Sequence, residues 1–76
     1  MNNERRKDLE KLVDQLEDIY SGIENCKIDE EECLNNIPEN LQNSERYSIG
    51  ENAIDCMEQA LDSIETAVDN INSAIE

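Results

Sequence analysis

Residues 53–76 repeat one heptad three and a half times: Ala53-Ile-Asp-Cys-Met-Glu-Gln, Ala60-Leu-Asp-Ser-Ile-Glu-Thr, Ala67-Val-Asp-Asn-Ile-Asn-Ser and Ala74-Ile-Glu. Apolar residues recur at alternating spacings of three and four, at Ile54, Met57, Leu61, Ile64, Val68, Ile71 and Ile75. This spacing is typical of a helix that packs lengthwise against another helix. The alanine that opens each heptad forms a column beside this seam, and such small side chains let a neighbouring helix approach closely.

The N-terminal half carries a second apolar stripe, which predicts a helix from about residue 3 to residue 34. Its members lie three, four and seven residues apart, at Leu9, Leu12, Val13, Leu16, Ile19, Tyr20, Ile23, Cys26 and Cys33. Gly22 lowers helix propensity by about 1 kcal/mol, but the stripe keeps its phase across it. We therefore expect a continuous helix, with Glu30 standing where the stripe calls for an apolar residue.

Residues 35–44 form the break between the two helices. Pro38 lacks an amide hydrogen and disfavours the helical conformation at Ile37. We expect a short helical turn after Pro38, with Ile37 and Leu41 folding back over the end of the bundle. Ser44 is a favourable N-cap, so the second helix is predicted over residues 45–75.

A loop of about ten residues predicts two antiparallel helices, so the fold class is an all-α antiparallel helical hairpin forming one domain over residues 1–76. Facing residues should then have numbers that total about 78, which places Gly50 opposite Ile28. Two helices bury only a narrow core. We therefore expect a homo-oligomer, a dimer or tetramer, in which hairpins self-associate into a four-helix-type bundle.

The chain holds 20 acidic and 6 basic residues, for a net charge of −14. This charge argues against direct binding to nucleic acid or to an anionic membrane, and favours basic protein partners. No apolar run is long enough for a membrane span or a signal peptide. The expected location is the cytoplasm of a bacterial host.

Catalytic chemistry is not indicated. The chain has no histidine, and its three cysteines, Cys26, Cys33 and Cys56, match no metal or redox spacing. We expect reduced thiols that serve as small core or boundary residues. The acidic run 29–32 lacks the alternating ligands and central glycine of a calcium loop. The sequence therefore predicts no catalytic residue, no metal site and no cofactor.

The start of the second helix departs from its heptad. Extending the repeat backwards places Arg46 in the alanine column, Tyr47 in the Ile54 column and Gly50 in the Met57 column. The missing side chain at Gly50 is expected to leave space beside Arg46 and Tyr47. Each of the other five basic residues has an acid at helical spacing, whereas Arg46 has none.

Two interpretations of Arg46 follow. In the first, Arg46 forms an ion pair with Glu30 across the hairpin, which would set the register more than it would add stability. In the second, an antiparallel second copy brings its Arg5 and Arg6 to Arg46 and Tyr47, beside the space at Gly50, and together they form a pocket for a phosphate-bearing ligand.

The acidic residues also allow two interpretations. Three aspartates recur one heptad apart, about 10.5 Å along a helix, and further acids follow the first helix. The residues in question are Asp55, Asp62, Asp69, Asp14, Glu17 and Asp18. They form either a solvated surface that keeps the bundle soluble or a mimic of the DNA backbone, with carboxylates in place of phosphates.

The chain resembles a group of small acidic proteins encoded by phages and prophages of gut Firmicutes. The most specific shared stretch is Pro38-Glu-x-Leu-Gln-x-Ser-Glu-Arg46, followed by acidic Ala/Ile heptads. The N-terminal stretch Glu4-Arg-Arg-Lys-Asp-Leu-Glu-Lys-Leu and the stretch Glu51-Asn-Ala-Ile-Asp also match. The resemblance implies a phage setting, in which small accessory proteins counter host immunity, with residues 38–46 as candidate functional positions.

The expected function is that of a non-enzymatic, phage-type counter-defence protein that sequesters a host immune component. One version binds a nucleotide second messenger in an oligomer pocket. The alternatives are an acidic DNA mimic that inhibits a DNA-binding or nuclease defence protein, and a structural coiled-coil assembly partner.

Overall fold

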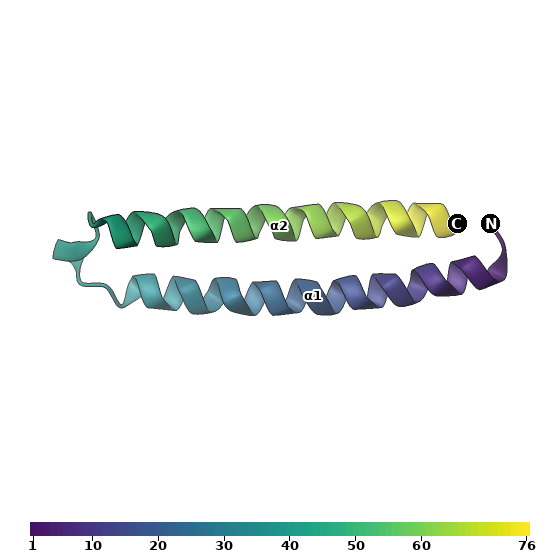
Figure 1. The fold of residues 1–76 in the computed structure, drawn as a ribbon, viewed down its shortest axis with the longest axis horizontal. Helices are drawn as coiled ribbons and strands as arrows, with labels where there is room; N and C mark the ends of the chain where they lie inside the picture. Colours follow the sequence, from purple (N-terminus) through teal and green to yellow (C-terminus); the bar gives the residue numbers. More distant parts are fainter.

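The computed structural model describes residues 1–76 as two long antiparallel helices joined by a short loop (Figure 1). Helix α1 spans Asn3–Asn35, the 3-10 helix η1 spans Glu39–Leu41, and α2 spans Glu45–Ile75. The Cα atoms extend 59 × 15 × 12 Å. The predicted all-α hairpin is confirmed, and each helix limit agrees with the prediction to within one residue.

Side-chain caps begin both helices. Asn2 Oδ1 accepts from the Arg5 amide at 2.7 Å, and Ser44 Oγ accepts from the Tyr47 amide at 3.3 Å. The second cap is the one predicted. Each satisfies an amide that has no partner inside its helix.

The loop behaves largely as the sequence indicates. Pro38 is extended, with ψ of 145°, and the Leu41 amide donates to the Pro38 carbonyl at 2.8 Å, which closes the predicted turn. Helix α1 continues through Gly22 without a break. Leu41 is 51% exposed, however, so it does not cover the end of the hairpin; Ile37 is half-buried.

The core of a single hairpin is narrow. Val13, Leu34 and Leu61 are the buried hydrophobic residues of the chain, and the other residues of the two apolar stripes are half-buried or exposed. Two helices in contact shield one stripe of each and leave the flanking columns in water. Neither helix has the length and apolarity that crossing a membrane requires.

The register of the two helices differs from the predicted one. Tyr20 contacts Glu65 and Lys27 contacts Glu58, and in both pairs the residue numbers total 85 rather than about 78. The difference is one heptad. A seam that repeats every seven residues presents the same columns after such a slip, so its period alone cannot specify the register.

The slip changes what lies beside Gly50. A Cβ atom placed on Gly50 would lie 2.5 Å from Leu34 Cδ2 and 2.9 Å from Glu30 Oε1. The prediction of open space at this position, opposite Ile28, is therefore wrong. Leu34 fills it, and the side chain missing from Gly50 is what allows Leu34 to pack there.

The two glycines provide a matched test of this contact. We expect Gly22→Ala to raise the free energy of unfolding by up to about 1 kcal/mol, because nothing lies within 4 Å of its new methyl group and alanine favours the helix. Gly50→Ala gains the same propensity but overpacks against Leu34, which typically costs about 1–3 kcal/mol.

Urea unfolding followed by circular dichroism, with both variants at one protein concentration, measures the difference. Equal stabilisation by the two substitutions would show that the space beside Gly50 is open after all.

Candidate functional site

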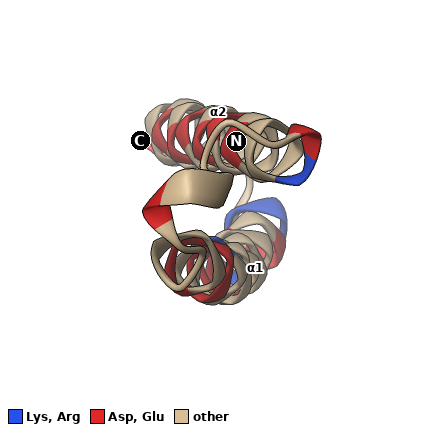
Figure 2. Ribbon diagram, turned by 90° about the vertical axis from the view of Figure 1, so that its left-hand side faces the viewer, with Lys and Arg blue, Asp and Glu red and all other residues tan.

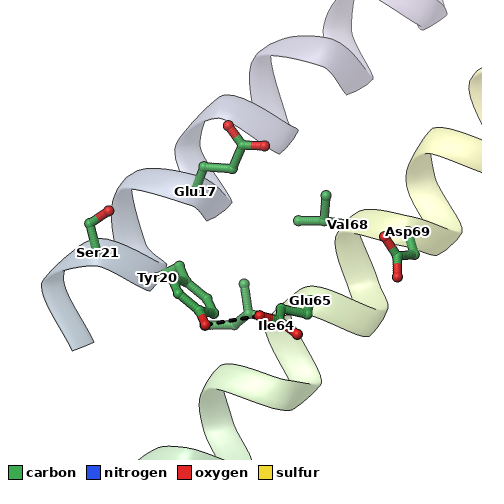
Figure 3. A pocket seen from close by; sticks show the side chains of 7 residues that line it. All are labelled: Glu17, Tyr20, Ser21, Ile64, Glu65, Val68 and Asp69. Carbon is green, nitrogen blue, oxygen red and sulfur yellow. Dashed lines mark hydrogen bonds between the residues drawn. The ribbon is translucent and has the colours of Figure 1, made fainter. Parts of the chain in front are cut away.

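A shallow groove of about 350 Å³ lies between the middle of α1 and the C-terminal half of α2 (Figure 3). Its lining combines three carboxylates with two aliphatic side chains, a tyrosine and a serine: Glu17, Tyr20, Ser21, Ile64, Glu65, Val68 and Asp69. Three carboxylates repel an anion and attract a basic group. The groove therefore suits a lysine or arginine side chain of a partner better than a phosphate.

Tyr20 connects the two walls of this groove. Its hydroxyl donates to Glu65 Oε1 at 2.9 Å. This hydrogen bond raises the pKa of Tyr20 above 10.0, and desolvation and the negative charges of Glu65, Glu24 and Asp62 raise the pKa further. Neutral tyrosine is the donor, so the contact stabilises the fold below about pH 10 and is lost as the pH rises through the folded-state pKa.

We expect Glu65→Gln to lower the pKa of Tyr20 towards 10.0, because the substitution removes the anionic acceptor. Tyrosinate absorbance measured in a Tyr47→Phe background reports Tyr20 alone. Glu51→Gln removes the same charge from the same heptad column without touching Tyr20, so it should leave the titration nearly unchanged. An identical shift in both variants would contradict the direct contact.

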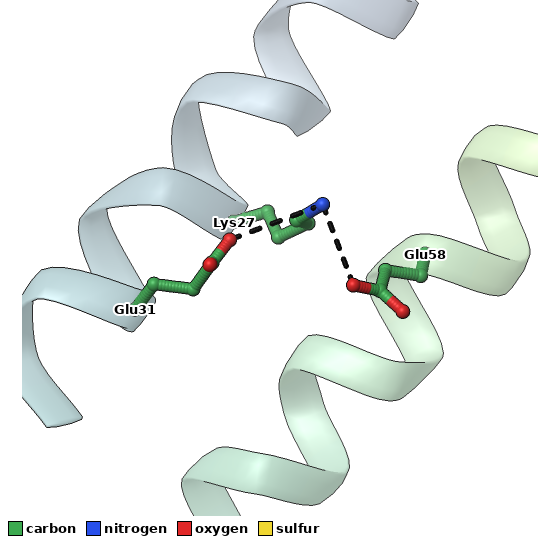
Figure 4. Close-up of polar contacts among 3 residues, drawn as sticks. All are labelled: Lys27, Glu31 and Glu58. Carbon is green, nitrogen blue, oxygen red and sulfur yellow. Dashed lines mark ion pairs between the residues drawn. The ribbon is translucent and has the colours of Figure 1, made fainter.

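Lys27 makes the ion pairs of the hairpin (Figure 4). Its Nζ lies 3.9 Å from Glu31 Oε1 on the same helix and 3.4 Å from Glu58 Oε1 on α2. The pairing with Glu31 follows the predicted helical spacing, whereas Glu30 lies against Gly50 instead. The carboxylates of both pairs are about half exposed, so each pair contributes little, on the order of 0.5 kcal/mol.

These contacts identify one side of the rod, which we call the acidic face. Glu58 and Glu65 border the seam there, and the heptad places further acids in the same columns or the adjacent ones. The acidic face consists of Glu10, Asp14, Glu17, Glu24 and Glu31 on α1 and Glu51, Asp55, Glu58, Asp62, Glu65 and Asp69 on α2.

The acidic face is dense and nearly unopposed by bases. Its carboxylates are spaced at about one per 3 Å of rod, close to the roughly 3.4 Å per phosphate of a single DNA strand. Viewed along the rod from the loop, acidic residues mark both helices while basic ones are few (Figure 2). Of the predicted mimic residues, only Asp18 lies elsewhere, on the outer side of α1.

The opposite side of the hairpin is apolar. Tyr20 and Lys27 reach α2 on the acidic side, so the columns that flank the seam on its other side lie away from the acids. We call them the apolar face: Leu12, Ile19, Cys26 and Cys33 on α1, and Ala53, Ala60, Ala67 and Ala74 on α2. The three cysteines are free and exposed, so the prediction that they are core or boundary residues is wrong.

The predicted anion-binding residues do not meet within one chain. Arg46 is exposed and forms no ion pair, so the predicted bridge to Glu30 is wrong. The register places Arg46 beyond the last turn of α1, level with the loop. Tyr47 is half-buried, and the space at Gly50 is filled.

The N-terminal arginines lie at the other end of the rod from Arg46. Arg5 borders a small groove that Asn2, Glu4 and Asp8 also line, and it forms no ion pair there. Arg6 points inward: its Nε is buried without a hydrogen-bond partner, and its NH1 donates to Asn3 Oδ1 at 3.4 Å. Only a second copy of the chain could bring these residues to Arg46.

Sequence reasoning missed the link between Tyr20 and Glu65. A signal for it was present, since Tyr20 and Lys27 occupy one inward column and Glu58 and Glu65 occupy one column of α2.

No group of three or more His, Cys, Asp or Glu side chains is arranged to hold a metal ion. Comparison with protein-family models, with curated proteins and with solved structures finds no match to this chain.

Proposed function

We propose that this protein is a non-enzymatic, phage-type binding protein that sequesters a basic component of host defence through its acidic face. The observation that carries the proposal is the continuous run of carboxylates along one side of a rod 59 Å long. The spacing of those carboxylates approaches that of phosphates on a DNA strand. The DNA-mimic version of the expected function is therefore the one that the geometry supports best.

The charge distribution supports capture of a DNA-binding or nuclease protein in particular. A surface evolved for phosphates presents lysine and arginine side chains, and these match a linear array of carboxylates. Within the acidic face, Lys27 is the basic residue that forms ion pairs, and it pairs with Glu31 and Glu58. Most carboxylates of the acidic face therefore remain available to a basic partner. The groove at Tyr20 adds a small apolar floor between Ile64 and Val68 for the stem of an inserted basic side chain.

We further propose that the working form is a self-associated bundle, because a single hairpin buries few of its apolar residues. Packing through the apolar face would leave the acidic faces directed outward. A role as a coiled-coil assembly partner for another protein uses the same apolar face. A closed homo-oligomer would occupy that face and argue against this role.

Neutralising part of the acidic face tests the mimic. We expect Asp55→Asn/Asp62→Asn/Asp69→Asn to weaken binding to the captured host protein at least tenfold at moderate salt, because three charges of the array are lost. The control, Asp18→Asn/Asp29→Asn/Glu32→Gln, removes the same net charge from the outer side of α1 and should bind nearly as the wild type does.

Host proteins retained on immobilised protein are identified by mass spectrometry, and their affinities are then measured by calorimetry with purified components. Duplex DNA should displace a mimicked partner. Equal weakening by both triple variants would indicate a nonspecific charge effect and argue against mimicry.

A second candidate is sequestration of a nucleotide second messenger, and the unpaired charge of Arg46 favours it. This version requires an oligomer, because Arg46 and Arg5 lie near opposite ends of a rod 59 Å long. We expect cyclic or ADP-ribose-type nucleotides to raise the melting temperature, and Arg46→Ala to abolish the rise. Lys11→Ala serves as the control, and no shift across such a nucleotide panel would eliminate this candidate.

A further inference from the structure

The hairpin leaves much of its apolar face open to water, although Ala53, Ala60 and Ala67 are half-buried. Leu12 and Ile19 are 48% and 51% exposed, and Cys26 and Cys33 continue their column in exposed positions. The alanine column runs beside them on α2. Large exposed apolar columns bordered by charged residues are typical of protein interfaces.

The two columns of the apolar face share one centre. The α1 column is centred between Ile19 and Cys26, and the alanine column is centred between Ala60 and Ala67. The register set by Tyr20 with Glu65 and by Lys27 with Glu58 makes these midpoints level to within about one residue. A twofold axis through this centre therefore superposes the whole apolar face on itself.

Charge selects the direction of such a pairing. The terminal end of the rod carries most of the basic residues, which are Arg5, Arg6, Lys7 and Lys11. The loop end carries a cluster of acids, which are Glu30, Glu31, Glu32, Glu39, Glu45 and Glu51. Copies running in the same direction would place acid on acid, whereas opposite directions place the basic end of one copy beside the acidic end of the other.

We propose that a second copy of this chain packs on the apolar face in the opposite direction, about a twofold axis between Ile19 and Cys26. Helix α2 then lies on the partner's α2 through the alanine columns, and α1 lies on the partner's α1. This arrangement rests on the proposed self-association and specifies its geometry. The contact is isologous and closes at two copies.

The size of the apolar face fits this role. Residues 12–33 cover about 32 Å of helix, and two adjacent helices make a face about 20 Å wide. The resulting area of about 600 Å² approaches the roughly 800 Å² that each partner contributes to a standard interface. The contact also encloses Leu12 and Ile19, which are left half exposed by the single hairpin.

The arrangement has a consequence for the arginines. Arg5 and Arg46 each lie one heptad outside the apolar columns, at opposite ends of the hairpin. Reversing the second copy brings the partner's Arg5 to the end that holds Arg46. Basic side chains from both copies therefore gather at each end of the dimer, which the nucleotide version of the function requires.

Engineered disulfides test the arrangement. In a Cys33→Ser/Cys56→Ser background, Ile19→Cys places a thiol level with the partner's Cys26. The two thiols within one chain are about 10 Å apart along a helix, which is too far to bridge. We expect mild oxidation to convert most of the protein to a covalent dimer on a non-reducing gel. Asp18→Cys in the same background is the control. It should form little covalent dimer, because residue 18 faces outward from α1.

Light scattering of the unmodified protein supplies the second measurement, with an expected mass of twice the 8.7 kDa chain. Ile19→Asp should weaken the dimer at least tenfold, while Ile28→Asp, at a residue that is 45% exposed in the column of Asp14 on the acidic side, should not. A dimer in which the Ile19→Cys variant forms no disulfide with the partner's Cys26 would overturn the antiparallel arrangement and leave self-association standing. A monomer at tens of micromolar would overturn both the antiparallel arrangement and self-association. It would leave the proposed capture of a host protein by the acidic face untouched.

Discussion

The packing of Leu34 against Gly50 determines which heptad of α1 faces which heptad of α2. The rest of the seam does not discriminate, because a slip of one heptad would again oppose apolar columns and would carry Lys27 from Glu58 to the equivalent Glu51. Gly50 breaks this equivalence, since it replaces a large side chain in the Met57 column and leaves a gap that one leucine fills. The placement of every other group follows from this choice.

This register separates the two long sides of the rod chemically. On one side, acids on both helices border the seam, and Lys27 and Tyr20 bridge to α2 between them. On the other side, Leu12, Ile19 and two cysteines run level with the alanines. A rod with one charged side and one apolar side is suited to two simultaneous tasks, since the apolar side can bury itself in an assembly while the charged side stays exposed to a partner.

The same register explains why one chain forms no anion site. Arg46 lies in the first turn of α2, beyond the end of α1, where no acid of α1 is level with it, and Arg5 lies at the far end of the rod. Along the middle of the hairpin, the many carboxylates repel a phosphate group. An anion site in this protein would have to be built at the ends of an oligomer, from residues of two copies.

Sequence alone determined the two helices, the cap at Ser44 and the turn after Pro38, because these depend on residue period, on backbone sterics and on hydrogen bonds between near neighbours. It also identified the acidic and alanine columns, which follow from the heptad. The register, the filled space at Gly50 and the unpaired state of Arg46 were decided only by the tertiary structure. A seven-residue repeat presents the same columns after a shift of seven residues, so the repeat does not specify the register of α1 against α2. Only the fit of unlike side chains across the seam, such as Leu34 and Gly50, distinguishes one register from the next.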